Sequence, residues 1–222
     1  MLDHIGYNNL LMIMEADKTF KHRQQWFQKL APLLGRAEIR DKYNLCLVHR
    51  HFNLQPGERM VATGLITQPE VVPASDSTPS DIIPSSWTAA GIPFEWKRVK
   101  AIEEIVAPPP AELVQEFSEI VGEGSILGLS LAQDPLPEGE IWCEHSNPDL
   151  RQHILEIQPV ETLSGGEASD TCWKVKISSD SGQAEVIFVN GCKCAPHDTH
   201  QPPPEERLFV GTSRFGLGPL LP

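Results

Sequence analysis

Apolar residues recur at helical spacing in two stretches of the chain. The first stretch runs from Glu15 to Leu34, and basic and amide side chains occupy its opposite face. We expect Pro32 to disturb the last turn of this helix and Gly35 to end it. The second stretch runs from Ala111 to Val121, directly after a run of three prolines that suits a helix start. The pattern predicts two main helices.

Apolar and polar residues alternate between Asn44 and Phe52, as they do in a strand. The alternation puts four residues on one face: Leu45, Leu47, His49 and His51. Gln55-Pro56-Gly57-Glu58 is a strong turn signal, and Arg59 to Thr67 is strand-like again. The sequence therefore predicts that Leu45–Phe52 and Arg59–Thr67 pair as an antiparallel hairpin.

Further strands are expected along the rest of the chain, at 93–99, 125–132, 140–145 and 152–160. Residues 172–178 and 184–190 flank a Ser-Asp-Ser-Gly turn and predict a second hairpin. The predicted fold class is α+β, an antiparallel sheet of β-hairpins with two main helices, in a barrel-like arrangement.

Prolines and serines dominate residues 68–92, which predicts a long irregular loop, either a lid or a disordered segment. Two apolar anchors in it, Ile82-Ile83 and Trp87, favour partial docking. A Pro/Gly-rich tail begins at about residue 202. We expect one domain over residues 1–222, since this length is within the range of a single large domain.

The formal net charge of −12 argues against nucleic acid as a partner, because binding to phosphates needs clustered Lys and Arg. No run of eighteen apolar residues is present, so no membrane span is expected. The N-terminus has no basic region of the kind that begins a signal peptide. Five cysteines, an odd number, fit a reducing compartment better than a disulfide framework. The expected location is cytoplasmic.

His49 and His51 are two residues apart on the predicted strand and can share a metal. This resembles the cupin-like barrels, in which a strand His-x-His is followed by a Glu. Glu58 follows here at wider spacing, and Pro137-Glu-Gly139 with His145 loosely matches the second cupin element. Two other interpretations stay open: a polar strand end without function, and an acid–base or oxyanion-binding pair in a small-molecule pocket.

A second cluster follows the last predicted hairpin and holds four metal-ligand side chains: Cys192, Cys194, His197 and His200. Thiolate and imidazole are ligands that Zn²⁺ prefers, but four from one short loop are crowded. A mixed site is easier to build, with further ligands from His49, His51, Cys143 or His145. The alternatives are an incidental surface loop and a Cys194 nucleophile activated by His197.

Several segments resemble a group of small uncharacterised proteins from filamentous fungi: His4–Asn9, Leu47–Phe52, Met60–Gly64 and the Cys-x-Cys after the last hairpin. The resemblance implies a stand-alone fungal protein, an accessory enzyme of specialised metabolism. It transfers no catalytic residue.

Two hypotheses remain after these observations. In the first, the protein is a metal-assisted or acid–base enzyme for a small-molecule ligand, with a pocket at His49 and His51. In the second, it is a non-catalytic binding or interaction protein with a structural or incidental Cys/His loop. A concave pocket lined by the two histidines favours the first hypothesis.

Overall fold

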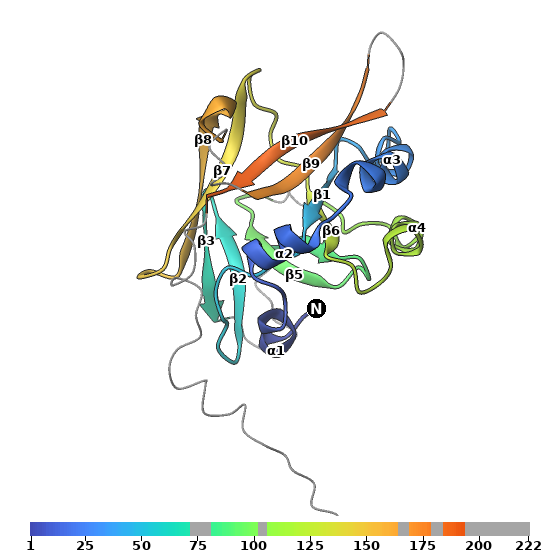
Figure 1. The fold of residues 1–222 in the computed structure, drawn as a ribbon. Helices are drawn as coiled ribbons and strands as arrows, with labels where there is room; N and C mark the ends of the chain where they lie inside the picture. Colours follow the sequence, from blue (N-terminus) through green and yellow to red (C-terminus); the bar gives the residue numbers. More distant parts are fainter. Residues whose placement is uncertain (72–80, 102–105, 164–168, 179–183, 194–222) are drawn as a thin grey trace, which may run out of the picture.

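The computed structural model describes residues 1–71, 81–101, 106–163, 169–178 and 184–193. In this part of the chain the strands close into a barrel in the order β1-β6-β4-β5-β2-β3-β8-β7-β10-β9 (Figure 1). The strands are β1 (Tyr43–Leu47), β2 (Glu58–Thr63), β3 (Ile66–Val71), β4 (Ile82–Thr88), β5 (Pro93–Arg98), β6 (Leu127–Leu131), β7 (Glu140–Asn147), β8 (Gln152–Pro159), β9 (Ser169–Ile177) and β10 (Ala184–Cys192). The helices are α1 (His4–Asn8), α2 (Ile13–Thr19), α3 (Arg23–Leu34), α4 (Ala111–Val121) and the short 3₁₀ helix η2 (Val160–Leu163).

The sheet is mixed, whereas the sequence predicted a purely antiparallel one. Strand β2 is parallel to β5, and β7 is parallel to β10. The remaining neighbours are antiparallel, and the β9–β10 hairpin is the one expected from the sequence. The α+β class and the barrel-like arrangement are thus confirmed.

The predicted hairpin between Leu45–Phe52 and Arg59–Thr67 is wrong. Strand β1 pairs with β6 and β9, and β2 pairs with β3 and β5. The second segment is itself a hairpin, because Gly64 turns the chain with a φ of +64°. A positive φ is favourable for glycine, and glycine is preferred in two-residue hairpin turns. The Pro56-Gly57 turn therefore joins two strands that are not partners.

The helix predicted from Glu15 to Leu34 is two helices. Helix α2 ends at Thr19 and α3 begins at Arg23, with His22 in the left-handed region at a φ of 55°. Pro32 lies inside α3, and Gly35 caps its C-terminus as predicted. The second predicted helix agrees with α4 at both ends.

The irregular loop expected at residues 68–92 is largely strand where the structure describes it. Its first residues end β3, and β4 begins at Ile82 and pairs with β5 and β6. Trp87 is buried in the main core. Pro84 is accommodated next to a bulge in the β4–β5 pairing, where an interstrand hydrogen bond is not needed. A lid made of β4 is therefore excluded.

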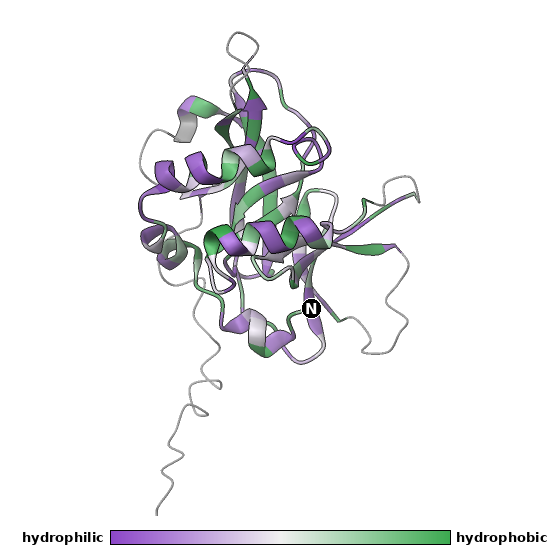
Figure 2. Ribbon diagram, turned by 90° about the vertical axis from the view of Figure 1, so that its right-hand side faces the viewer, coloured by the Kyte–Doolittle hydropathy of each residue, from purple (hydrophilic) through white to green (hydrophobic). Residues whose placement is uncertain are grey.

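Three clusters of buried hydrophobic residues hold the described part of the barrel together, and the smallest consists of Val61, Ile82 and Trp96. The largest lies between one wall of the barrel and helices α2, α3 and α4, with Leu30, Leu45, Phe117 and Trp173 among its residues. Figure 1 shows α3 and α4 on the same side, opposite β7 and β8. Figure 2 shows hydrophobic and hydrophilic residues mixed along the helices, as expected when one helix face packs on a core.

A second core cluster lies beside helix α1. Its buried residues are Tyr7, Cys46, Val48, Phe52, Leu54, Met60 and Phe94. These residues come from α1, from three strands and from the segment that follows β1, so they join that segment to the barrel wall. The segment that carries His49 and His51 is held by this packing.

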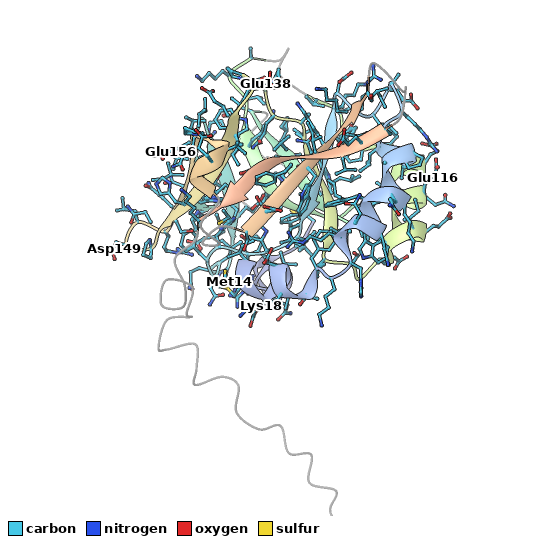
Figure 3. The ribbon with its side chains drawn as sticks, turned by 45° about the horizontal axis from the view of Figure 1, so that its top comes forward. Met14, Lys18, Glu116, Glu138, Asp149 and Glu156 are labelled. Carbon is cyan, nitrogen blue, oxygen red and sulfur yellow. The ribbon has the colours of Figure 1, made fainter. Side chains whose placement is uncertain are left out.

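The outer surface carries charged side chains, including Glu116, Glu138, Asp149 and Glu156 (Figure 3). In the described part of the chain, no helix has the length and apolar character needed to cross a membrane. The Pro/Gly-rich tail expected from residue 202 lies outside the described residues.

Candidate metal centre inside the barrel

His49 and His51 lie just beyond the end of β1 at Leu47. Val48 and Arg50 still donate backbone hydrogen bonds to neighbouring segments, to the carbonyls of Ile126 and Leu11. Both histidines line one cavity, as the sequence predicted, and are 6% and 2% exposed. A strict strand alternation would have kept them on the face of Leu45, which packs in the helix-side core. Because the regular strand ends at Leu47, the chain can direct both rings into the barrel.

A carboxylate from a distant strand joins the two histidines. The ligand atoms of His49, His51 and Glu144 on β7 all lie within 4.8 Å of one another. This is the spacing of side chains that can hold one metal ion. Glu144 has a side-chain exposure of 14%, so the group is buried. A buried His/Glu group that can hold a metal is therefore present in the barrel.

The orientation of His49 leaves the right atom for a metal. Its Nδ1 is 2.7 Å from the carbonyl oxygen of Leu47. A carbonyl only accepts, so Nδ1 carries the proton in this contact and Nε2 of the neutral ring has the lone pair. A backbone carbonyl bonded to the second ring nitrogen is the common arrangement for a metal-binding histidine.

Two neighbours hold the Glu144 carboxylate. Asn190 on β10 donates a hydrogen bond from Nδ2 to Oε1 at 2.5 Å, and His153 on β8 brings its Nε2 to 3.3 Å from Oε2. Burial raises the pKa of Glu144, but His153, His49 and the Asn190 hydrogen bond oppose it and lower the pKa overall. The carboxylate is therefore held in its ionised form, which is the form that binds a metal.

His153 completes the cluster without belonging to the three-residue group. Its ring lies against that of His51, with the centroids 3.8 Å apart, and it is 7% exposed. Neither Glu144 nor His153 was singled out from the sequence. Each lies on a correctly predicted strand, but both faces of those strands carry polar residues, so the alternation does not reveal which face is internal.

The cavity that contains this cluster has a volume of about 540 Å³. Aromatic and aliphatic side chains line it together with hydroxyl and amide groups and with charged side chains, which include Lys97, Arg98 and Lys100. Glu95 on β5 also lines it and accepts a hydrogen bond from Ser86 Oγ at 3.0 Å. Burial and the charge of Glu144 raise the pKa of Glu95 to about 7, although His153 and the Ser86 hydrogen bond lower it.

Two cavity-lining thiols belong to this wall but are poor ligands. Cys46 and Cys172 are free and face each other across β1 and β9. Burial raises the pKa of Cys172 to about 12 and that of Cys46 well above its usual value. Because the thiolate is the nucleophile and the metal ligand, these thiols are inert at neutral pH.

Glu58 and His145, which the cupin likeness suggested as further metal ligands, do not belong to the group formed by His49, His51 and Glu144. Glu58 is bound to the guanidinium of Arg151 at 2.8 and 2.9 Å, away from the cavity. His145 lies 3.9 Å from Glu156 and is partly exposed. Glu144, the residue next to His145, is the one that reaches the histidine pair, since adjacent strand residues point to opposite faces.

The Cys/His cluster can be described only at its first residue. Cys192 is buried at the end of β10, 2% exposed. Cys194, His197 and His200 lie outside the described residues. Neither Cys192 nor Cys143 belongs to the group formed by His49, His51 and Glu144. Cys192 is in a disulfide in this structure and so offers no thiolate to a metal. A metal site formed by the other residues of the Cys/His cluster stays a prediction.

Comparisons of the chain with protein-family models, with curated proteins and with solved structures found no match. The chemistry assigned to the site therefore rests on its own residues.

Proposed function

We propose that this protein is an enzyme that encloses a small organic molecule in its barrel and acts on it with a divalent transition metal. His49, His51 and Glu144 hold the metal, and zinc is the first candidate. The observation that carries the proposal is the convergence of these three ligand atoms within 4.8 Å on the wall of a cavity of about 540 Å³.

The donor set fits a catalytic metal better than a structural one. Structural zinc sites are closed by four protein ligands, whereas catalytic sites have three and keep a position for water or substrate. Two imidazoles and one carboxylate suit zinc and also the neighbouring first-row metals. When bound, such a metal supplies a Lewis acid that stabilises negative charge on a substrate oxygen. The burial of His49, His51 and Glu144 limits the access of water to that position.

A metal-free acid–base site is the second candidate. It is favoured by the 3.3 Å approach of His153 to Glu144, which has the arrangement of a carboxylate orienting an imidazole. In that case His153 would exchange the proton and Glu144 would hold its ring. The two candidates differ in metal content, so one measurement separates them.

The test is elemental analysis of the full-length protein, purified without chelator and then supplied with zinc. We expect about one equivalent bound by a site that the double variant His49→Ala/His51→Ala and the single variant Glu144→Gln both lose. The double variant Cys192→Ser/Cys194→Ser is the control for the Cys/His cluster and should keep this equivalent. Metal that survives in Glu144→Gln but disappears in the cysteine variant would move the site to the cluster. A metal-free wild type would leave the acid–base site.

A further inference from the structure

A second carboxylate faces the metal centre from across the barrel. Glu95 lies on β5 and Glu144 on β7, and both line the same cavity. Around the ring, β5 is followed by β2, β3, β8 and then β7, so the two strands are four steps apart in a closed barrel. They stand on nearly opposite walls. Glu95 lines the same cavity but lies outside the group of three metal ligands.

The Glu95 carboxylate is fixed through one oxygen, and its other oxygen can contact a bound molecule. Ser86 donates a hydrogen bond to its Oε2 at 3.0 Å, and this is the hydrogen bond that its carboxylate accepts within the described residues. Oε1 therefore remains for a ligand. Two other carboxylates in the described part of the chain line the cavity, and neither is placed as Glu95 is. Glu144 belongs to the metal group, and Asp134 is exposed to solvent.

The charged groups around Glu95 come from several elements. Besides burial, the charge of Glu144 raises the pKa of Glu95 and His153 lowers it, and the charge of Glu95 in turn raises the pKa of Tyr7 on α1 and of Cys46 on β1. Lys97 follows on the same strand and also lines the cavity. No guanidinium is bound to Glu95 in the described structure, unlike Glu58 with its Arg151. Its carboxylate is free to gain and lose a proton.

Building on the proposed function, we infer that Glu95 is the acid–base residue of the site and that the substrates are enolisable carbonyl compounds. The carbonyl oxygen lies toward His49, His51 and Glu144, and the adjacent C–H group lies toward Glu95. The C–H bond breaks, its proton passes to Oε1 of Glu95, and its electron pair forms the enolate. The negative charge develops on the oxygen beside the metal centre. Return of the proton to carbon restores a carbonyl compound, so no oxidant or reductant is needed.

The near-neutral pKa of Glu95 agrees with this role, because a general base works best when its pKa is close to the working pH. The positions of the metal centre and of Glu95 also assign a separate role to each. A cation stabilises the charge on one wall, and a carboxylate on the other wall transfers the proton.

The test measures deuterium exchange into two probes, hydroxyacetone and acetylacetone, by proton NMR in D₂O with zinc-loaded full-length protein. We expect wild type to accelerate exchange of at least one probe, and Glu95→Gln to lower that rate roughly 10²–10⁴-fold. The zinc content of Glu95→Gln should equal that of wild type, since Glu95 is not a ligand. Asp134→Asn is the matched control from the same cavity and should exchange at the wild-type rate.

The outcomes separate the two proposals. Equal exchange by Glu95→Gln and wild type, or no exchange of either probe by zinc-loaded wild type, overturns the role of Glu95. If the protein binds no metal and exchange still depends on Glu95, the proposed metal site is overturned, whereas the role of Glu95 as the base is retained.

A second variant covers the case in which Glu95→Gln does not fold. Ser86→Ala keeps the carboxylate but removes the hydrogen bond that lowers its pKa. Its exchange–pH profile should move to higher pH, and an unchanged profile counts against Glu95. A readout without turnover is carbon NMR of the labelled carboxyl groups. A signal that titrates near pH 7 should be present in wild type and Asp134→Asn and shifted upward in Ser86→Ala.

Discussion

Glu95 and Glu144 are two carboxylates in one cavity with opposite electrostatic surroundings. Burial acts on both, but Glu144 has His153, His49 and the Asn190 amide beside it, and its pKa falls. Glu95 has one hydroxyl donor and the charge of Glu144, and its pKa rises to about 7. A pair of acids whose surroundings separate their pKa values in this way is typical of sites in which one group binds charge and the other transfers protons.

The raised pKa of Glu95 predicts a pH-dependent stability. Its pKa is about 7 in the folded protein and about 4.3 in an unfolded chain, so the folded state binds an extra proton between these values. The contribution is complete below the unfolded pKa and is lost as pH rises through 7. We expect the free energy of unfolding of metal-free wild type to fall by about 2 kcal/mol between pH 5.5 and 7.5 relative to Glu95→Gln. Urea denaturation at both pH values measures this, and parallel changes in the two proteins would contradict it.

Asn190 predicts an effect on metal affinity through Glu144. Its Nδ2 hydrogen bond fixes Oε1, and loss of such a bond to a metal ligand weakens affinity by about 10–100-fold. We expect this loss of zinc affinity for Asn190→Ala in a titration against a competing chelator. Asn147→Ala, at the last residue of β7, is the control and should bind as wild type does. Unchanged affinity of Asn190→Ala would show that Glu144 does not hold the metal.

At the scale of elements, the segments Leu45–Phe52 and Arg59–Thr67 were recognised as extended, but their bounds and their pairing were wrong. The Pro56-Gly57 turn indicates a reversal, but the pairing of β2 is decided by Gly64, which returns the chain at once into β3. Strand β1 is left to pair with β6 and β9, and this close pairing depends on a small residue on β6. Gly128 lies opposite Cys46, where the backbones of β4 and β6 are close.

We therefore expect a substitution at Gly128 to destabilise the fold strongly. A Cβ there would meet the carbonyl oxygen of Trp87 and lie 2.7 Å from Cγ2 of Val48. Since backbone cannot move aside as a side chain can, we expect Gly128→Ala to lower the free energy of unfolding by about 3 kcal/mol. Gly124→Ala is the control, because a Cβ at Gly124 meets nothing within 4 Å. Chemical denaturation compares them, and equal stabilities would show that the strands separate easily.

At the scale of the molecule, closure of the barrel assembles the site. His49 follows β1, Glu95 lies on β5, Glu144 on β7 and His153 on β8, so residues more than a hundred positions apart line one cavity. Helices α2 to α4 pack on one wall only, and β7 and β8 are on the opposite side (Figure 1). The metal ligands thus bridge the helix-supported wall and the opposite one.

A metal that bridges two walls should stabilise the whole fold. Binding to the folded state alone at 100 times the dissociation constant contributes about 2.7 kcal/mol. For a protein of 222 residues this corresponds to a rise in Tm of about 5–10 °C. We expect that rise for wild type with zinc in a thermal melt. Glu144→Gln should show little change, and an equal rise in that variant would place the stabilising metal elsewhere.

The sequence by itself determined helix α4, one hairpin and two of the three candidate metal ligands. Helix α4 and the β9–β10 hairpin followed from local periodicity and turn residues, and His49 and His51 were recognised as candidate ligands from their residue chemistry. These features depend on neighbours in the chain, which a pattern records directly.

Only the tertiary structure decided the strand order, the two parallel pairs and the rest of the site. Glu144, His153 and Glu95 are single polar residues on strands whose two faces are both mixed, so nothing local marks them. Their role depends on which face is internal and which strand is adjacent. Both follow from long-range pairing and from the packing of helices on one wall, because a strand satisfies its hydrogen bonds with whichever partner the closed barrel brings beside it.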